Sequence, residues 1–410
     1  MTPFCCRLCG AGVTRTFVDL GTTPLANAYL RPDQLDQPEP RYPLHTLVCD
    51  TCLLVQLEAL VTPDELFSDY AYFSSYSDSW VEHARRFALS AQAALGLGPE
   101  SLVVEVASND GYLLQHFVAA GVPVMGIEPA ENVAEVAVAR GVRTESVFFG
   151  RATAEDLVAR GLVADLVVAN NVFAHVPDLG DFVAGLATVL KPSGVVSIEV
   201  PHLLRLVEEV QFDTIYHEHF SYFSLLTAER ALARHGLAVF DVEQLPTHGG
   251  SLRIWSAPTG AGRPETERLG QVRRMESEAG LDRIETYAGF GARVERLREG
   301  VLSFLAEARA AGRSVVAYGA AAKGNTLLNY CGITTADIEY VADRSREKQG
   351  RLLPGSHLPV EAPGHIFETR PDYVVILPWN LRREISAQLG AIRDWGGQFV
   401  TFVPDVAVWP

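Results

Sequence analysis

Two stretches of the chain alternate short apolar runs with helical segments, and this alternation constrains the fold more than any other feature. Within residues 101–200 the apolar runs are SLVVEVA, VPVMGIE, ADLVVANN and GVVSIEV. Such runs are typical of parallel strands that are buried on both faces and joined by covering helices. A second series follows Gly312, with SVVAYGAAAKGNTLLNYCG, IEYVAD and DYVVILPWN. The chain is therefore predicted to be α/β, with two doubly wound sheets.

Length and charge narrow the class of protein further. A chain of 410 residues is too long for one core, so we expect domains at 1–77, 78–258 and 259–410. The charged region 265–312 has helical spacing of its apolar residues and is predicted to be a helix pair that spans domains. The net charge of −16 argues against a nucleic acid partner. With no membrane-length apolar run and no signal-peptide pattern, we expect a cytoplasmic protein that does not bind membranes. We also expect a monomer or a weak oligomer.

Four cysteines form two pairs with metal-ligand spacing. Cys6 and Cys9 make one CxxC pair, and Cys49 and Cys52 make the other, with 39 residues between the two pairs. Two such pairs supply the four thiolates of a tetrahedral zinc site. Four protein ligands leave no position for water, so the zinc is predicted to be structural. Two disulfides or free thiols are the alternative, which a cytoplasmic setting disfavours.

Polar residues follow three consecutive predicted strands of the first series. Glu105 ends the first strand and is followed by a Ser-Asn-Asp-Gly turn, Glu128 and Pro129 follow the second, and Asn170 and Asn171 follow the third. A Gly-containing turn before a helix lets a ligand approach backbone N–H groups, and an acidic residue after the next strand commonly holds ribose hydroxyls. The turn is not G-x-G-x-x-G, so a nicotinamide site remains a competing interpretation.

The segment TIYHEHFSYFS, Thr214 to Ser224, concentrates aromatic rings, two histidines and one carboxylate. Its candidates for a general base are His217 and His219, with His175 from the segment after the third strand, and Glu218 is a candidate to orient one of them. If the segment were a strand, His217 and His219 would share one face and Tyr216 and Glu218 the other. A metal site and a purely structural aromatic corner are the alternatives.

These motifs together resemble a known family. Glu105, the SNDG turn, Glu128 and LKPSG (Leu190 to Gly194) resemble an S-adenosylmethionine (SAM)-dependent methyltransferase. With the CxxC pairs, YHEHFSYFS, HGGSLR and YGAAAKGNT they resemble, in order and over essentially the whole chain, the C-methyltransferases of nucleotide-linked deoxysugars. Within that family the chain most resembles the branch that methylates C-3 in the tetronitrose pathway. The resemblance implies a zinc-binding domain, a Rossmann-like methyltransferase core and a Rossmann-like C-terminal domain.

The resemblance also implies a reaction and its residues. The substrate class is a thymidine-diphospho (TDP) 4-keto deoxysugar, with a 3-amino sugar favoured, and the product belongs to antibiotic sugar biosynthesis. His219 matches the family's proposed general base, and Tyr216 and Glu218 match its neighbours. Carbon methylation needs a base and a stabilised enolate oxygen, for which His175 is a candidate. The residues expected to bind SAM are Glu105, Ser108, Asn109, Gly111, Glu128, Pro129, Asn170 and Asn171.

The predicted contacts to the sugar nucleotide are more widely spread. Lys323 and Asn325, at the turn after YGAAA, suit a pyrophosphate, although the turn can also be a relic without ligand. His248 and Arg253, in HGGSLR, are candidates that can equally belong to a surface hairpin. Tyr70 is expected to close over the active site, or else to pack at a domain junction, and Tyr222 is a further expected contact of the substrate. Two other functions remain open: an O- or N-methyltransferase, and a zinc-stapled protein that binds a nucleotide without catalysis.

Overall fold

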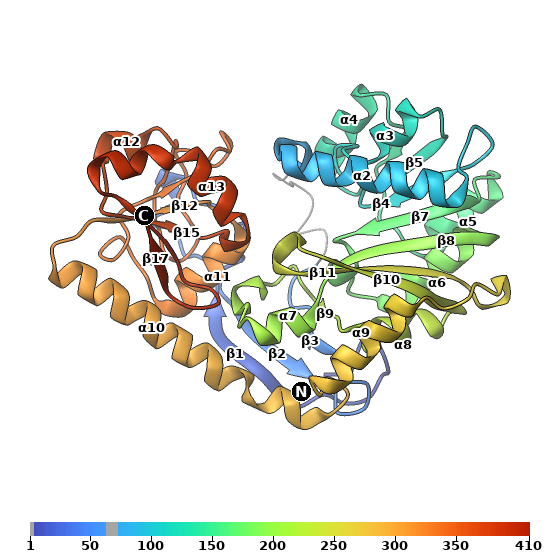
Figure 1. The fold of residues 1–410 in the computed structure, drawn as a ribbon, viewed down its shortest axis with the longest axis horizontal. Helices are drawn as coiled ribbons and strands as arrows, with labels where there is room; N and C mark the ends of the chain where they lie inside the picture. The colour runs from blue at the N-terminus through green and yellow to red at the C-terminus, as the bar shows by residue number, and fades with distance from the viewer. Residues whose placement is uncertain (1–3, 63–72) are drawn as a thin grey trace.

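The structure is a computed structural model that describes residues 4–62 and 73–410. It contains three sheets, and Figure 1 shows two large α/β units flanking a smaller N-terminal part. In the ranges described, no helix combines the length and apolar character that crossing a membrane requires.

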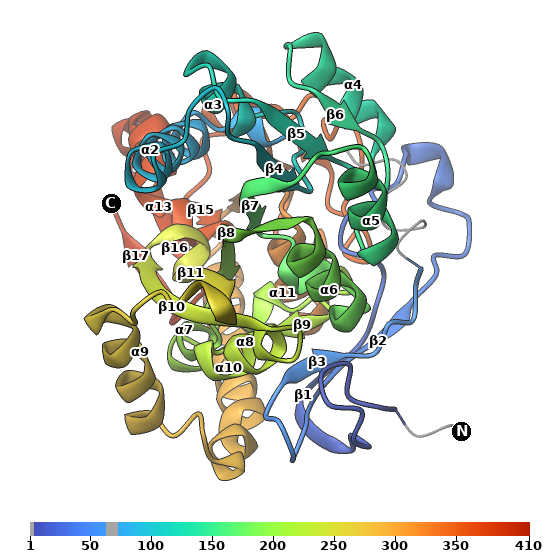
Figure 2. The ribbon, with the colours of Figure 1, turned by 90° about the vertical axis from the view of Figure 1, so that its right-hand side faces the viewer.

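The N-terminal part is an antiparallel sheet in the order β1-β2-β3-β9. Its strands are β1 (Arg15–Thr23), β2 (Tyr42–Val48), β3 (Val55–Leu57) and β9 (Ser221–Tyr222). The last strand comes from the middle of the chain, and Figure 2 shows it beside β3. The N-terminal sheet therefore extends beyond the predicted boundary at residue 77, because β9, from later in the chain, is its fourth strand.

The central sheet has the order β10-β11-β8-β7-β4-β5-β6. Its parallel strands are β4 (Val103–Val106), β5 (Val124–Ile127), β6 (Thr144–Glu145), β7 (Ala164–Asn170) and β8 (Leu190–Pro201). The strands β10 (Leu237–Leu245) and β11 (Ser251–Pro258) are antiparallel to their neighbours. The chain order reverses between β4 and β7, which is where open α/β sheets bind ligands.

Helices cover both faces of the central sheet, as its near-continuous apolar strands predict. Val103 and Leu166 face one core, whereas Val104 and Val167, one residue further on, face the other. The first core contains α2 (Asp78–Leu95) and α3 (Leu114–Ala119), with α4 (Glu131–Ala139) nearby. The opposite core contains α5 (Arg151–Ala159), α6 (Leu179–Val189), α8 (Leu225–Ala233) and α9 (Glu267–Glu278). The short helix α7 (Leu203–Glu208) follows β8.

The C-terminal sheet repeats this architecture, in the order β14-β13-β12-β15-β16-β17. Its strands are β12 (Val315–Tyr318), β13 (Val341–Ala342), β14 (Val360–Glu361), β15 (Tyr373–Ile376), β16 (Gln398–Thr401) and the antiparallel β17 (Ala407–Trp409). Its helices are α10 (Phe290–Ala310), α11 (Ala322–Cys331), α12 (His365–Thr369) and α13 (Arg382–Gln388). The helix pair predicted at 265–312 is present as α9 and α10, and Figure 1 shows α10 running along the edge of the molecule.

The N-terminal sheet shares a core with the C-terminal unit. Phe17 of β1 stacks on Phe290 of α10 with ring centroids 4.4 Å apart. The cysteine-rich end of the same part instead packs with the central unit, where Cys49 and Leu54 join the core of α8. One small N-terminal part therefore bridges the two large units, which brings residues from all three together.

Candidate active site

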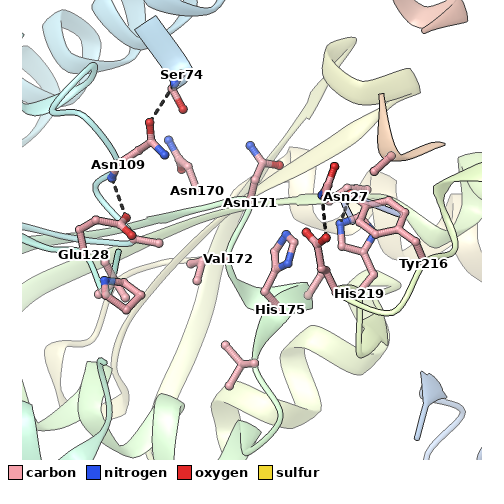
Figure 3. Close-up of a pocket in the computed structure, with 18 of the residues that line it drawn as sticks. Asn27, Ser74, Asn109, Glu128, Asn170, Asn171, Val172, His175, Tyr216 and His219 are labelled. Atoms are coloured by element: carbon pink, nitrogen blue, oxygen red, sulfur yellow. Dashed lines mark hydrogen bonds between the residues drawn. The ribbon is translucent and has the colours of Figure 1, made fainter. Parts of the chain in front are cut away.

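A cavity of about 750 Å³ lies where the three parts of the molecule meet. The carboxyl ends of β4, β5 and β7 form one wall, the Tyr216–His219 segment forms a second, and the start of α11 forms a third. Figure 3 shows Glu128 and Asn109 on one side and His175, Tyr216 and His219 on the other. A ligand in this cavity can therefore contact two regions at once. These are the residues predicted to bind SAM and the segment 214–224, called here the histidine-rich segment.

Glu128 organises the turn after β4. Its carboxylate accepts hydrogen bonds from the backbone N–H of Asn109 at 2.9 Å and of Ala130 at 3.0 Å. Burial raises the pKa of Glu128, and these two bonds oppose that shift. Asn109 adopts a left-handed backbone with φ 49°, and its side chain accepts from the N–H of Ser74 at 2.8 Å. The carboxylate is thus held at the edge of the cavity, as a ribose ligand must be.

Three other residues predicted to bind the cofactor belong to this turn or to the strand before it, and lie outside the cavity lining. Glu105 is buried without a hydrogen-bond partner for either oxygen, and burial, reinforced by Glu128, raises its pKa well above the ordinary value. Ser108 packs against Gly126, where an added Cβ would lie 2.5 Å from its hydroxyl. Gly111 has φ 77° and fits against Val142. The structure places these residues as supports of the turn.

Pro129, Asn170 and Asn171 do line the cavity. The side-chain amide oxygen of Asn170 and both polar atoms of the Asn171 side-chain amide are buried without a hydrogen-bond partner from the protein. Leaving such atoms unsatisfied costs about 1–3 kcal/mol each, so they fit a polar ligand. With the Glu128 carboxylate and Asn109 of the turn, they are a donor and acceptor set that suits the ribose and amino-acid portions of SAM.

The histidine-rich segment forms a turn rather than a strand at residues 217–218, so strict alternation of side chains does not apply. His219 Nδ1 lies 2.9 Å from the carbonyl oxygen of Thr214, which can only accept, so Nδ1 carries the proton. His219 Nε2 then accepts from the hydroxyl of Tyr216 at 2.8 Å. Burial and the neighbouring His175 hold the pKa of His219 well below 6.5. A neutral histidine with a defined tautomer is a competent proton acceptor.

Glu218 and His175 lie beside this pair. Burial raises the pKa of Glu218 to about 7, against a hydrogen bond of 2.6 Å that Asn27 donates to its carboxylate. Burial lowers the pKa of His175 to about 4, against a backbone hydrogen bond to Glu218. The rings of His175 and His219 are 4.7 Å apart. His217 instead lies 3.2 Å from the carbonyl oxygen of Pro43 and does not line the cavity.

The third wall carries two of the chain's three lysines. Lys323, in the first turn of α11, donates to Asn380 at 2.8 Å and lies over the ring of Trp379. Lys348 donates to the carbonyl oxygen of Ala320 at 2.7 Å and lies over the ring of Tyr29. Two ammonium groups beside a helix N-terminus suit an anionic ligand.

Contacts from α11 and from Trp379, which follows β15, tie this wall to the histidine-rich segment and the residue just before it. Thr326 donates to the carbonyl oxygen of Ile215 at 2.8 Å, and the indole of Trp379 donates to Asp213 at 2.7 Å. Burial raises the pKa of Asp213 to about 6, and Lys323 opposes that shift. Asn325, a predicted substrate ligand, is buried outside the cavity lining and donates to the carbonyl oxygen of Ala26. It holds the segment that carries Asn27.

Of the remaining predicted substrate ligands, His248 lines the cavity, and burial lowers its pKa to about 4. Arg253 does not line it. Its guanidinium is buried against Glu199 at 2.8 Å and over the ring of Phe87, so it is already paired within the protein. Tyr222 is buried in β9 outside this cavity. Tyr70 lies outside the described residues.

Sequence analysis missed several lining residues, among them Asn27, Tyr29, Trp80 and Lys348. Asn27, Tyr29 and Lys348 are isolated residues outside helices and strands, where no periodicity singles them out, and Trp80 lies in the first turn of α2. Lys348 offered one usable signal, since lysine occurs only three times in the chain.

The four cysteines form the predicted zinc site. Their Sγ atoms all lie within 4.8 Å of one another, with 3.4 Å between Cys6 and Cys52 and 3.5 Å between Cys9 and Cys49. Zinc–sulfur bonds of about 2.3 Å in a tetrahedron require sulfurs about 3.8 Å apart, so the set fits the ion. Among residues 4–62 and 73–410 this is the one cluster with such an arrangement. A metal site at the histidine-rich segment is therefore not supported there.

Comparison with known proteins identifies the families to which parts of the chain are similar. Family models match a zinc binding domain at residues 6–67, a methyltransferase domain at 80–242 and a C-methyltransferase C-terminal domain at 246–404. C-methyltransferase NovU from Streptomyces niveus is 36% identical over 403 residues, which cover 98% of this chain and 96% of that protein.

More distant relatives match a smaller part of the chain. A ubiquinone biosynthesis O-methyltransferase from Bartonella bacilliformis is 29% identical over 97 residues, 23% of this chain and 39% of that protein. The crystal structure of magnesium protoporphyrin IX methyltransferase from Synechocystis PCC 6803 is 16% identical, with a TM-score of 0.33 over 44% of this chain and 82% of its own. The full-length match to NovU, with all three domain models, decides the assignment: the chain belongs to the family of SAM-dependent C-methyltransferases with a tetra-cysteine zinc site.

Proposed function

We propose that the protein transfers a methyl group from SAM to C-3 of a TDP-linked 4-keto deoxysugar, with a 3-amino sugar favoured, in antibiotic sugar biosynthesis. The observation that carries the proposal is one cavity that joins three sets of groups. These are a carboxylate turn of the type that holds SAM, a neutral Tyr216–His219 pair, and a wall with two lysines. The full-length similarity to a C-methyltransferase supports carbon as the acceptor.

The chemistry of carbon methylation requires removal of a proton next to a ketone. In the proposal the Tyr216 oxygen takes the C-3 proton while its own proton moves to Nε2 of His219, to which it is already bonded. The products of this step are an enolate and an imidazolium whose Nδ1–H still donates to Thr214. When bound, SAM supplies the electrophilic methyl group that the enolate carbon takes up.

The enolate oxygen needs a hydrogen-bond donor. With a pKa of about 7, Glu218 carries a proton on a large share of molecules at neutral pH, and its other oxygen is already bonded to Asn27. Glu218 is therefore the proposed donor to the 4-keto oxygen. His175, the donor predicted from the sequence, is second, because a backbone hydrogen bond to Glu218 occupies one nitrogen of its neutral ring.

The other cavity residues have proposed binding roles. Glu128 holds the ribose, and Asn109, Pro129, Asn170 and Asn171 surround the rest of SAM, while Glu105, Ser108 and Gly111 support the turn. Lys323 and Lys348 face the pyrophosphate, and His248 faces the sugar. Zinc stabilises the N-terminal part.

Mass spectrometry of products tests the function. Incubation with SAM and TDP-4-keto deoxysugars is expected to add one methyl group to at least one of them. A 4-ketone activates both C-3 and C-5, so NMR of the product is used to locate the carbon that carries the new methyl group. A methyl group at C-5 would move the proposal to that carbon, and the absence of any methylated sugar nucleotide would reject this substrate class.

A further inference from the structure

Arg7 lies inside the zinc-binding knuckle, between Cys6 and Cys9, and its guanidinium reaches toward the active site. It donates to the carbonyl oxygen of Pro177 at 3.0 Å and to that of Leu57. Its backbone N–H donates to Gln56 at 3.0 Å, and the Gln56 amide donates to the Cys6 sulfur at 3.1 Å. The backbone of Arg7 is therefore linked to the metal ligands, and its guanidinium is linked to the segments that contain Leu57 and Pro177.

The same guanidinium contacts the histidine-rich segment. It lies over the ring of Phe220, 5.4 Å from the centroid, which is within the range of a cation–π contact. Phe220 is itself bonded at both backbone groups, donating to Ala174 at 2.8 Å and accepting from Leu57 at 2.9 Å. Strand β3, which carries Leu57, pairs with β9 directly after Phe220.

These contacts converge on the two histidines of the active site. Pro177 follows His175 by two residues, and Phe220 follows His219 directly. The two histidines come from segments about 40 residues apart, yet their rings lie 4.7 Å from each other. The planar guanidinium has several donors in a fixed geometry, so one side chain can hold both segments at a set distance.

We propose that Arg7 is a positioning residue for methyl transfer, which sets the His175 and His219 segments relative to each other from the zinc knuckle. The knuckle would then act on the geometry of the reaction as well as on folding. This inference rests on the proposed function for its kinetic readout, but its structural readout needs no acceptor.

The experiment compares Arg7→Ala and Arg7→Lys with Arg230→Ala, all with zinc content measured. Arg230 is a matched control, because its guanidinium also donates to a backbone carbonyl of the knuckle, that of Cys52 at 2.9 Å, but from α8. The rate of deuterium exchange into the acceptor is measured with S-adenosylhomocysteine bound, and the Kd of that ligand is measured by calorimetry.

For Arg7→Ala we expect exchange to slow by about 10- to 100-fold, the size expected for a small displacement of catalytic groups. The Kd for S-adenosylhomocysteine should change by less than about two-fold, since Glu128 and Asn109 lie on another wall. Added guanidinium ion should restore part of the rate, and Arg7→Lys should be intermediate. Arg230→Ala should exchange at close to the wild-type rate.

The imidazole ¹⁵N resonances of His219, assigned with His219→Gln, provide the acceptor-free readout. They should shift in Arg7→Ala as the Tyr216–His219 hydrogen bond loosens, and remain in place in Arg230→Ala. Unshifted resonances in Arg7→Ala, or equal rate losses in the two alanine variants that follow their melting temperatures, would overturn the positioning role. If the wild-type protein exchanged no deuterium into any acceptor, the proposed function alone would be contradicted. The His219 resonances would then decide whether Arg7 is a positioning residue.

Discussion

The central and C-terminal sheets each use one carboxylate to hold the turn after a strand, but they present opposite charges to the shared cavity. In the central sheet the carboxylate of Glu128 accepts from the N–H of Asn109 and of Ala130. In the C-terminal sheet the carboxylate of Asp343 accepts from the N–H of Ala320 at 2.7 Å and of Ser345 at 2.8 Å. Each carboxylate follows the second strand and holds the turn after the first.

What surrounds the two turns differs. Around Glu128 lie neutral asparagines, whereas the second turn is flanked by Lys323 and Lys348. A sulfonium cofactor carries positive charge and a sugar nucleotide carries negative phosphates, so a division of ligands between the sheets follows from electrostatics. The comparison teaches that one backbone device can serve two ligands when the neighbouring side chains change.

The largest expected effect is a loss of kcat on substitution of His219, the proton acceptor that lies between the two sheets. His219→Asn keeps a polar side chain but removes the proton acceptor, so kcat should fall by about 10²- to 10⁴-fold. The Kd for S-adenosylhomocysteine and for TDP should stay near wild type, because both sheets are untouched. Retention of most of the rate would point to an acceptor that needs no enolate, such as oxygen or nitrogen.

The next test concerns the lysine wall. Lys323→Met should raise the KM for the sugar nucleotide by about 10- to 100-fold, as the loss of a hydrogen bond to a charged group implies. The KM for SAM should hold. Lys191→Met is the control, since Lys191 pairs with Asp165 at a partly exposed site outside the cavity lining. An equal KM increase in both variants would break the assignment of Lys323.

A reciprocal pair of substitutions sharpens the comparison of the turns. In Glu128→Gln or Asp343→Asn an amide NH₂ faces a backbone N–H, which weakens the turn it holds. We expect Glu128→Gln to weaken S-adenosylhomocysteine binding by about 10-fold and Asp343→Asn to weaken TDP binding by a similar factor. Calorimetry of both ligands with both variants gives the four values. If each variant weakened both ligands alike, the two sheets would not have separate ligands.

The smallest expected effect is the pH dependence of kcat. The pKa of His219 is lowered from 6.5, so it gains a proton and loses its base function only as pH falls below that value. The pKa of Glu218 is raised to about 7, so its proton, and its role as donor, is lost as pH rises through about 7. The rate should be highest between these values. Glu218→Gln, which keeps a donor at all pH values, should lose the alkaline decline, and a decline that persisted would assign it to another group.

Much of this organisation is readable from the sequence because it depends on short-range patterns. The CxxC spacing predicted the metal ligands, and apolar runs separated by helical segments predicted two doubly wound sheets. The positions of Glu128 and Lys323 follow from their places after strands, because the carboxyl ends of parallel strands share one edge of a sheet. The segment from Tyr216 to His219 was predicted as a site from its composition, whereas its local conformation, a turn at residues 217–218, was left open by the sequence.

Only the tertiary structure decided which of these groups meet. Asn27 and Glu218 are 191 residues apart and hydrogen-bonded, and Arg253 was expected at a phosphate but pairs with Glu199. Such contacts depend on how the N-terminal part is wedged between the two large units, and no local spacing encodes that arrangement. The sequence by itself determined the elements, the zinc ligands and the reactive side chains. Long-range packing determined their partners, and through burial it determined the pKa values on which the proposed chemistry depends.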